Sequence, residues 1–517
     1  MTALSAGIPL ARAMDKPSHA VRILQVYSVA LMVFPSNYDL KIVGAGGYVA
    51  AMVSYVALAL WVAGTLLGHH DAFACRYPIR VTLACMWAVT IASYVLMHRA
   101  SMTSEQLLSA NRWLMQLAGM SGVVLVAAEG LRTLEDVRRV LRVLTRGGAF
   151  CGIVAALQFV AKIDLTRYLI LPGFSRNTAA SITAEIVQRG SLNRVYGTAV
   201  DPIELGVSAG MLLALALYLL MYDTSQAKWK RVVPVLCIAL SVGASVSRSA
   251  IISVTVSVGV LIVLLPPLRR LKWLAMVPLV VGIVVIAAPS LISTLTTLFL
   301  AGNSDPSIAH RTNNYPYVEQ LVSQAPWLGQ GPNTSLPVGT HILDNQYLST
   351  AINMGLLGVA ALAFYLAWPS VVALAARRRS TDPELRDLCA TLAGTGLAAV
   401  LCAGTFDGFY FPMFFNLQAL TAGLAGAAWM LASKGTKRDE SKERRELDNE
   451  LFLDRRDLVA AQEGIDPSDL ANPAWSGLRL GNSSSHIPGG WQGSVGEPSR
   501  SSHCSRDSPG SRLGQDK

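Results

Sequence analysis

Three apolar stretches decide the fold of this chain: IELGVSAGMLLALALYLLM (Ile203–Met221), VVPVLCIALSVGASV (Val232–Val246) and IISVTVSVGVLIVLL (Ile251–Leu265). Each approaches the length of a helix that crosses the hydrocarbon core of a bilayer, which takes about 20 residues. Glu204 is the one charged side chain within them. Because a bilayer offers the backbone no hydrogen-bond partners, such segments fold as helices. The chain is therefore predicted to be an all-α membrane protein.

The composition agrees with a protein whose solvent is mostly the bilayer. Of the 517 residues only 15% are charged, against about 25% in soluble domains, and 52% are hydrophobic. The formal net charge of +10 would also suit a nucleic-acid partner. Most of the basic residues, however, stand in short segments beside the apolar runs, where Lys and Arg set the orientation of membrane helices. The charge is therefore interpreted as a signal of topology, and no nucleic-acid partner is expected.

The apolar runs along the whole chain predict about twelve transmembrane helices. The segment Leu131–Arg146, rich in Arg with apolar spacing, is instead predicted to be an amphipathic helix at the inner membrane surface. The predicted spans are Ile23–Phe34, Val43–Leu67, Ile79–Leu96, Leu107–Ala128, Gly147–Ala161, Ile203–Met221, Val232–Val246, Ile251–Leu265, Trp273–Ala288, Tyr347–Trp368, Leu388–Cys402 and Pro412–Leu431.

The basic residues assign an orientation to these spans. With the N-terminus in the cytoplasm, the inner segments carry twenty Lys and Arg and the longer outer segments carry nine, which satisfies the positive-inside rule. Both termini are then cytoplasmic. Two long outer loops follow, 162–200 and 301–346, and loops of this length are usually functional or disordered. Residues 1–434 form the predicted membrane domain, and residues 435–517, rich in Ser, Gly, Pro and Arg toward their end, form a mostly disordered cytoplasmic tail.

Arginines beside membrane segments are the first candidates for a site. Arg248 stands in SVSRSA between two apolar runs with almost no loop. Its charge either binds an anion at the outer mouth of the bundle or snorkels to lipid headgroups, and the sequence leaves both readings open. Arg194 precedes Asp201 and Glu204 at the start of a span. Asp201, followed by Pro202, is interpreted first as a helix N-cap.

The second long outer loop contains the other candidates. Arg311 is its one basic residue apart from histidine, and His341 and Asp344 stand just before the chain re-enters the membrane near Tyr347. His and Asp are plausible general bases. The alternative for Asp344 is that it, or Asn345, caps the next helix. The eight histidines show no metal-ligand spacing, so no metal site is predicted.

Three blocks, in this order, resemble the O-antigen ligase and polymerase superfamily, which consists of multispanning glycosyltransferases of the bacterial envelope. The first block is RVYGT followed by DP and LG, from Arg194 to Gly206, before a span. The second is SRS around Arg248. The third combines Arg311 with LGQG at 328–331, NQYL at 345–348 and GLLG at 355–358. Order, spacing and topology agree over residues 192–358.

This resemblance implies an enzyme of the bacterial cytoplasmic (inner) membrane. Such an enzyme transfers or polymerises a glycan from an undecaprenyl-diphosphate carrier onto a hydroxyl of a glycan or lipid acceptor, at the outer face of the membrane. The reaction is metal-independent and uses no cofactor, so fixed cations must stabilise the diphosphate leaving group. Arg194, Arg248 and Arg311 are the diphosphate-binding residues that the resemblance implies.

The resemblance also points to the base that accepts the proton of the acceptor hydroxyl. Ligases of the family commonly place a His directly before the Asn that starts the re-entering helix. Here Asp344 has that place and His341 stands three residues earlier, so either is a candidate base. The difference favours a polymerase or another envelope-glycan transferase over a ligase.

Two other functions stay open. Many spans with interior charges also suit a transporter, although the two halves show no repeat symmetry and the charges gather at the outer end instead of the midplane. The second is a non-catalytic scaffold of an envelope-polysaccharide pathway. The transferase hypothesis requires Arg194, Arg248 and Arg311 to converge on one outward cavity, and it predicts that Arg248→Ala abolishes turnover.

Overall fold

The computed structural model of the protein describes residues 18–43, 46–68, 70–71, 77–99, 102–169, 172–176, 187–189, 192–276, 314–335 and 343–435. All of them belong to the first of two units, Met1–Lys442 and Glu443–Lys517, into which the chain divides. Within this part of the first unit helices predominate, as expected for apolar runs of span length.

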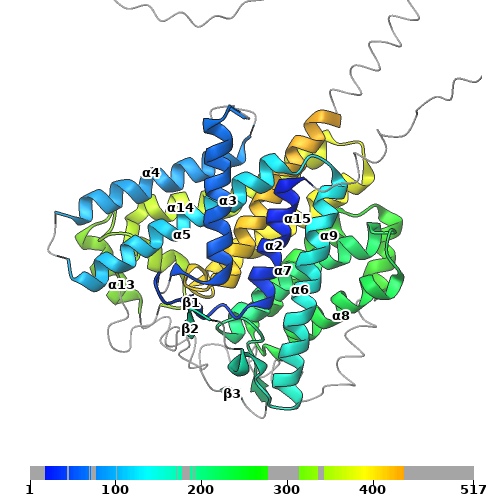
Figure 1. Ribbon diagram of the computed structural model, residues 1–517, viewed down its shortest axis with the longest axis horizontal. Coiled ribbons are helices and arrows are strands. Elements are labelled where there is room, and N and C mark those ends of the chain that lie inside the picture. The colour runs from blue at the N-terminus through cyan, green and yellow to red at the C-terminus, as the bar shows by residue number, and fades with distance from the viewer. Residues whose placement is uncertain are drawn as a thin grey trace, which may run out of the picture. The chain divides into compact units, whose positions relative to one another are not determined.

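Eight of the described helices are long and apolar enough to cross a membrane, and α2 and α9 are shorter apolar helices. The protein is therefore a multi-pass helical membrane protein. The helices are α2 (His19–Val33), α3 (Val49–Leu66), α4 (Ile79–Met97), α5 (Ser104–Gly130), α6 (Leu134–Val160), α7 (Pro202–Tyr222), α8 (Lys228–Ala244), α9 (Arg248–Leu264), α13 (Tyr315–Gln324), α14 (Gln346–Arg379), α15 (Pro383–Ala403) and the helix Pro412–Gly435 (Figure 1).

Every predicted span except Trp273–Ala288 overlaps one of these helices. Residues 277–288 of that span lie outside the described residues. Residues 267–276, which include its first four residues, are helical. The second predicted outer loop and the tail are described only in part. The count of twelve spans, the extent of both outer loops and the disorder of the tail therefore stay predictions.

Helix α6 differs from its prediction. The segment Leu131–Arg146 is predicted to lie on the membrane surface, but most of it forms the first half of the 27-residue α6. Its apolar side is buried, and Val140 is fully inaccessible. Its charge is largely neutralised inside the protein, because Arg142 lies 2.6 Å from Asp223 and 2.8 Å from Glu135. These pairs remove the charge that would otherwise keep the segment at the surface.

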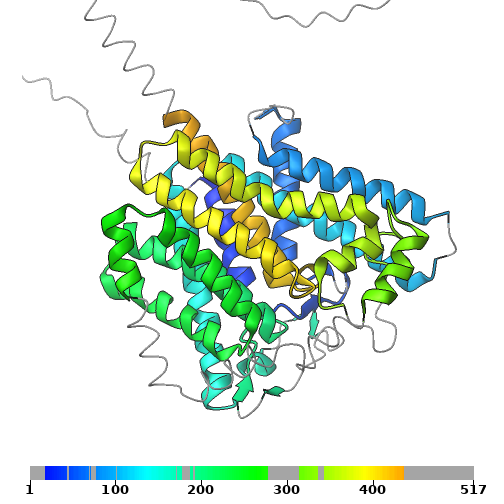
Figure 2. The ribbon, with the colours of Figure 1, turned by 180° about the vertical axis from the view of Figure 1, so that it is seen from behind.

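Helix α7 is buried on nearly all sides. Small residues let α9 approach it closely, a common feature of membrane helix contacts. Ser253 and Ser257 of α9 donate hydrogen bonds to the carbonyls of Val207 and Gly210, both at 2.7 Å. A side chain at Gly210 would clash with Ser253. Helix α15 packs against α9 and α14 and completes this side of the bundle (Figure 2).

Two glycine-rich blocks far apart in the sequence form one backbone junction. Helix α14 is kinked at Gly355, whose φ is 65°. The turn after α13 docks there, and the amide of Gly331 donates to the carbonyl of Asn353 at 2.9 Å. A side chain at Gly329 would approach the backbone of Asn353 to 2.4 Å, and Gly355 is equally crowded. Both positions therefore require glycine, which explains two of the motifs on which the family resemblance rests.

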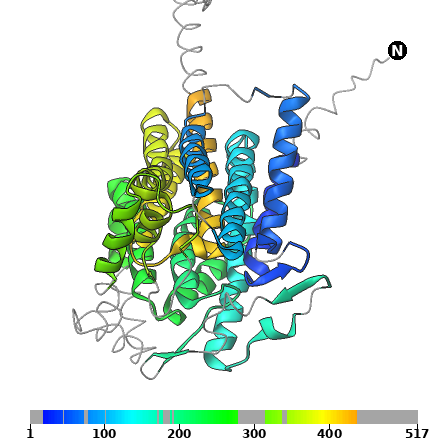
Figure 3. The same ribbon diagram turned by 90° about the vertical axis from the view of Figure 1, so that its left-hand side faces the viewer.

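The strands gather at one end of the bundle, called here the strand end (Figures 1 and 3). Strand β1 (Tyr38–Leu40) pairs antiparallel with β2 (Phe174–Arg176), and β3 (Val187–Arg189) pairs antiparallel with β4 (Leu192–Arg194). Strands β2 to β4 belong to the first predicted outer loop. This loop therefore contains secondary structure for which its sequence shows no strong signal.

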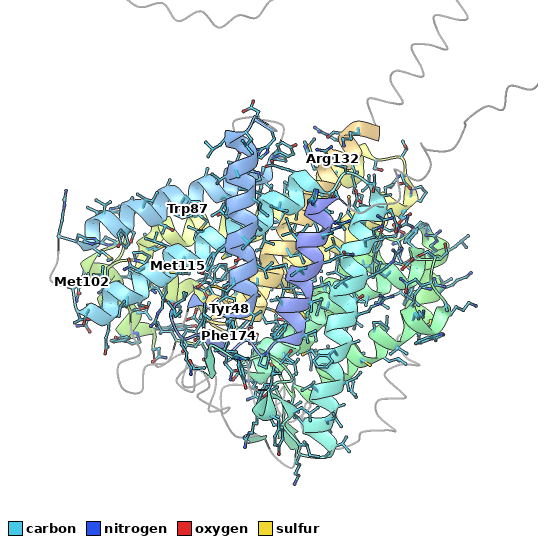
Figure 4. The ribbon with its side chains drawn as sticks, viewed as in Figure 1. Tyr48, Trp87, Met102, Met115, Arg132 and Phe174 are labelled. Carbon is cyan, nitrogen blue, oxygen red and sulfur yellow. The ribbon has the colours of Figure 1, made fainter. Side chains whose placement is uncertain are left out.

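Helices α7, α9 and α14 begin near the strand end, and α15 ends there. The turns between α5 and α6 and between α7 and α8 lie at the other end of the bundle, called here the opposite end. Figure 4 shows both: Tyr48 and Phe174 lie together at the strand end, whereas Arg132 lies at the opposite end. The candidate site residues that the structure describes, Arg194, Arg248 and Asp344, belong to the strand end. Most of the described Arg-rich segments belong to the opposite end.

Candidate functional site

Arg194 is the last residue of β4 and lies partly buried at the strand end. Its Nε donates a weak hydrogen bond of 3.4 Å to the carbonyl of Ser245, in the turn between α8 and α9. Its Nη2 is buried and finds no hydrogen-bond partner among the described residues. Burial lowers the pKa of the guanidinium, and the nearby carboxylate of Asp201 opposes this effect. An arginine in this state has free capacity for an anionic ligand.

Arg248 begins α9 directly after the turn that Arg194 contacts. The turn has an unusual backbone, because Val246 adopts a φ of 47°, in the left-handed region that β-branched residues rarely occupy. Strained backbone of this kind often marks functional positions. Arg248 stands three residues after Ser245, so Arg194 and Arg248 meet at one turn. Arg311, the third predicted arginine, lies outside the described residues.

A polar clamp holds the backbone that carries Arg194. The side-chain amide of Gln158, near the end of α6, accepts a hydrogen bond from the Gly197 amide (2.7 Å) and donates one to its carbonyl (3.2 Å). Asp164 accepts hydrogen bonds from the Tyr196 hydroxyl at 2.6 Å and from the Gln158 amide at 3.0 Å. Although burial favours the neutral acid, the hydrogen bonds that Asp164 accepts lower its pKa. The clamp fixes this segment against α6.

Asp201 caps α7, as its place before Pro202 indicates. Its Oδ1 accepts a hydrogen bond from the amide of Ile203 at 2.6 Å. The same carboxyl is electrostatically coupled to Arg194 and Asp344. Burial raises the pKa of Asp201, and the charge of Asp344 raises it further. The hydrogen bond from the Ile203 amide and the charge of Arg194 oppose this shift. The cap of α7 therefore lies between the arginine turn and the start of α14.

Glu204, in the first turn of α7, is a fully buried structural carboxylate. It accepts hydrogen bonds from the amides of Val200 at 2.7 Å and Met413 at 2.5 Å, and a longer one from Phe414 at 3.3 Å. It thereby joins the beginnings of two helices that are far apart in the sequence. All three of these hydrogen bonds come from backbone amides, so the role of Glu204 is to hold the strand end together.

Asn345, and not Asp344, is the N-cap of α14. The side-chain oxygen of Asn345 accepts a hydrogen bond from the amide of Tyr347 at 2.9 Å. Asp344 is partly exposed beside it and acts electrostatically on Asp201. The cap alternative for Asp344 is thus removed, and its role as a base stays a prediction. His341, the other candidate base, lies outside the described residues.

Asp407 is an acidic residue of the strand end that none of the sequence patterns above singles out. It lies in the turn between α15 and the helix Pro412–Gly435. Burial raises its pKa to about 7; a hydrogen bond with Ser349 opposes this shift, and the charge of Asp344 adds to it. An acid with this pKa is poised to accept a proton at neutral pH. The sequence signal is a lone acid among four aromatic residues, in TFDGFYF at 405–411.

A small polar cavity lies beside Asp407. One wall is α14, and the others come from α5, the turn after α13 and the turn around Asp407 itself. Amide, hydroxyl and aromatic groups of this kind can hydrogen-bond or stack against a sugar. The residues that line it include Trp113, Asn333, Gln346, Ser349, Asn353 and Tyr410.

The fold and this end of the bundle define a class: a multi-pass membrane protein with an arginine bound to the turn before Arg248 and three electrostatically linked carboxyl groups, Asp201, Asp344 and Asp407. A comparison with protein families shows that residues 233–363 match the family described as O-antigen ligase. This match agrees with the resemblance to the O-antigen ligase family that the sequence shows. The match includes Arg248 and Asp344, whereas Arg194 and Asp407 lie outside it. A comparison with curated proteins found no match.

Proposed function

We propose that the protein transfers or polymerises a glycan from an undecaprenyl-diphosphate carrier onto a hydroxyl acceptor, at the outer face of the bacterial cytoplasmic membrane. The match of residues 233–363 to the O-antigen ligase family supports glycan transfer in general. The observation that carries the finer proposal is the buried Nη2 of Arg194, at the turn that leads into Arg248, which has no hydrogen-bond partner among the described residues. Such a turn suits a ligand with concentrated negative charge, and the diphosphate leaving group is that ligand.

In the proposed reaction the acceptor oxygen attacks the anomeric carbon of the donor sugar. The bond between that carbon and the diphosphate oxygen breaks, and the carrier diphosphate leaves with the electron pair. Arg194 and Arg248 stabilise the charge that develops on the diphosphate, together with Arg311. Because arginines stay charged at all physiological pH values, they can supply this stabilisation without a metal ion.

The acceptor hydroxyl must lose its proton to a base as it attacks. Asp344 and His341 are the bases that the family resemblance implies. Asp407 is a third candidate, because its pKa of about 7 allows it to take a proton at neutral pH and release it afterwards. We assign the proton to Asp407. The role of Asp344 is then to keep the pKa of Asp407 near neutral by its own negative charge.

An apolar groove supports a donor with a polyprenyl chain. The groove runs along α9, α14 and α15, measures about 700 Å³ and is lined almost entirely by apolar side chains, among them Val263, Leu374 and Leu397. One part of it reaches Thr255, which is about two helical turns from Arg248 in the same helix. A carrier with its diphosphate at Arg248 can therefore lay its isoprenoid chain along this groove.

Transfer from a defined undecaprenyl-diphosphate oligosaccharide in proteoliposomes tests the proposal. The comparison includes wild type, Arg248→Ala and the control Arg132→Ala, which removes an exposed arginine of the opposite end. We expect product that resists EDTA from wild type and control, and none from Arg248→Ala, whose thermal unfolding should match wild type. Normal turnover by Arg248→Ala, or loss of product with EDTA, would contradict the proposal. A lack of product with every donor would favour a transporter or a scaffold.

A further inference from the structure

We infer that the opposite end of the bundle carries a binding site for the phosphate group of an anionic glycerophospholipid, at the mouth of the small pocket between α6, α7 and α8. This site is separate from the proposed transfer reaction and does not depend on it. The described lining of the pocket contains more cations than carboxylates. Its ionisable lining residues are four cations, Arg142, Arg146, Lys230 and Arg231, and one carboxylate, Asp223.

The one carboxylate of the pocket is already neutralised. Arg142 donates two hydrogen bonds to Asp223, from Nε at 2.6 Å and from Nη2 at 2.8 Å. This bidentate pair is the strong form of an arginine–carboxylate contact and uses both oxygens of Asp223. The charges of Arg146, Lys230 and Arg231 are therefore not balanced by any carboxylate that lines the pocket.

The two remaining arginines are held in place by neutral groups. Nη1 of Arg231 donates to the carbonyl of Leu220 at 3.2 Å, while its Nε is buried and has no hydrogen-bond partner among the described residues. Nη2 of Arg146 donates to the side-chain oxygen of Gln226 at 2.5 Å. Both guanidinium groups are thus positioned without being neutralised. A phosphate group, with several acceptor oxygens and a negative charge, complements them.

The outer face of α8 identifies the ligand as a lipid. Four of its most exposed apolar side chains are Trp229, Val233, Leu236 and Leu240, which are 64%, 42%, 62% and 52% exposed. Steps of three or four residues place them on one face of the helix, next to Lys230. In a bilayer this face contacts acyl chains, and a tryptophan at its end lies at headgroup level. A molecule with a phosphate beside Lys230 at the mouth of the pocket and chains along this stripe is a glycerophospholipid.

The charge balance also selects an anionic headgroup. A zwitterionic lipid would bring an ammonium group that needs a negative partner, and the only carboxylate lining the pocket is occupied by Arg142. Phosphatidylglycerol brings a phosphate and no cation. The attraction should weaken with added salt, because Lys230 is exposed to solvent.

Thermal unfolding of the purified, delipidated protein in detergent tests the site. Phosphatidylglycerol and phosphatidylcholine with the same acyl chains are titrated, and glycerol phosphate at equal concentrations reports binding of a phosphate without chains. We expect phosphatidylglycerol to raise the unfolding temperature of wild type, with little effect from the other two. Equal stabilisation by phosphatidylcholine would refute the anionic selectivity. Equal stabilisation by glycerol phosphate would show a soluble-phosphate site and refute the lipid.

The variant Lys230→Gln/Arg231→Gln removes two of the three unbalanced cations. The half-saturating phosphatidylglycerol concentration should rise on the order of 25-fold, since each cation near anionic lipid contributes about fivefold. Arg132→Gln, which removes an exposed arginine of the same end, should leave it unchanged. If the double variant does not fold, Lys230→Gln alone alters an exposed side chain and should show a rise of about fivefold. Wild-type affinity in a folded variant would overturn the site.

Discussion

Two partly buried arginines, Arg142 at the opposite end and Arg194 at the strand end, have contrasting surroundings. Arg142 contacts Asp223 at 2.6 Å and Glu135 at 2.8 Å, so its charge is satisfied within the protein. Arg194 has a 3.4 Å bond to the carbonyl of Ser245 and a buried nitrogen without a partner among the described residues. Because unsatisfied buried polar groups cost stability, such a group indicates a ligand.

The acidic residues show the same contrast. At the opposite end Asp223 is paired with Arg142. Burial raises the pKa of Asp223, but the hydrogen bond with Arg142 opposes burial, and the resulting pKa is lowered. At the strand end Asp201, Asp344 and Asp407 act on one another, and burial raises the pKa of Asp201 and Asp407. The first arrangement stabilises the fold. The second gives Asp407 a pKa of about 7, in the range that a general base needs at neutral pH.

The largest effect is expected from breaking the satisfied pair at the opposite end. Arg142→Ala leaves the side chain of Asp223, which is 2% exposed, charged and without its main partner. We expect a loss of about 3–5 kcal/mol in the free energy of unfolding, which is the usual cost of an orphaned buried charge. Chemical unfolding of the protein in detergent measures it.

The double variant Arg142→Met/Asp223→Leu is the control for this prediction. Replacing both partners by apolar residues should restore most of the stability, because no unpaired charge remains. If Arg142→Ala were as stable as wild type, Arg142 and Arg194 would not differ in the way that the contacts indicate.

A smaller effect is expected from loosening the clamp that positions Arg194. Gln158→Leu leaves the buried amide and carbonyl of Gly197 without their side-chain partner and should cost about 1–3 kcal/mol. It should also raise KM for the lipid-linked donor, because the segment with Arg194 loses its fixed position. Tyr196→Phe, which removes one hydroxyl, should cost about 1 kcal/mol. If Gln158→Leu lowers the stability but leaves KM unchanged, the clamp contributes to the stability of the protein and not to donor binding.

Asp407 is expected to impose a pH dependence on turnover and on stability. Turnover should rise with pH and be half-maximal near pH 7, where the carboxyl loses its proton. Stability should move the other way. Because the pKa is raised from 3.8 to about 7 on folding, the folded protein binds the proton more tightly, and stability falls as pH rises from about 4 to 7.

Asp407→Asn should weaken the dependence of stability on pH over this window and abolish the rise of turnover. The pH–rate profile and unfolding temperatures measured at several pH values check both effects. A profile of the active protein that stays flat through pH 7, with Asp407→Asn fully active, would exclude Asp407 as the base and leave the role to Asp344 or His341.

The features that the sequence predicts well are local. Apolar runs of span length form helices wherever the structure describes them, because the pattern that drives burial is contained in each run. The cap role of Asp201 follows from the Asp-Pro pair that begins α7. The convergence of Arg194, Arg248 and Arg311 on one cavity, which the family resemblance implies, stays a prediction.

The features that it does not predict depend on distant partners. The sequence at the start of α6 predicts a surface helix. In the structure Asp223, 81 residues away from Arg142, neutralises the charge of Arg142. The raised pKa of Asp407 arises from burial and from Asp344, which belongs to another helix start. Gln158 reaches Gly197 across 39 residues. In each case the decisive contact joins segments whose proximity only the packed bundle establishes.

Binding of undecaprenyl diphosphate itself tests the central claim most directly, because it needs neither the natural glycan nor turnover. Affinities are measured in detergent for wild type, Arg194→Gln and Arg132→Gln, together with unfolding temperatures. We predict binding about 10- to 100-fold weaker for Arg194→Gln, from the ~1.5–3 kcal/mol of a hydrogen bond to a charged group. Unfolding temperatures and the affinity of Arg132→Gln should stay as in wild type. Wild-type affinity in a folded Arg194→Gln variant would contradict the assignment of this arginine to the diphosphate.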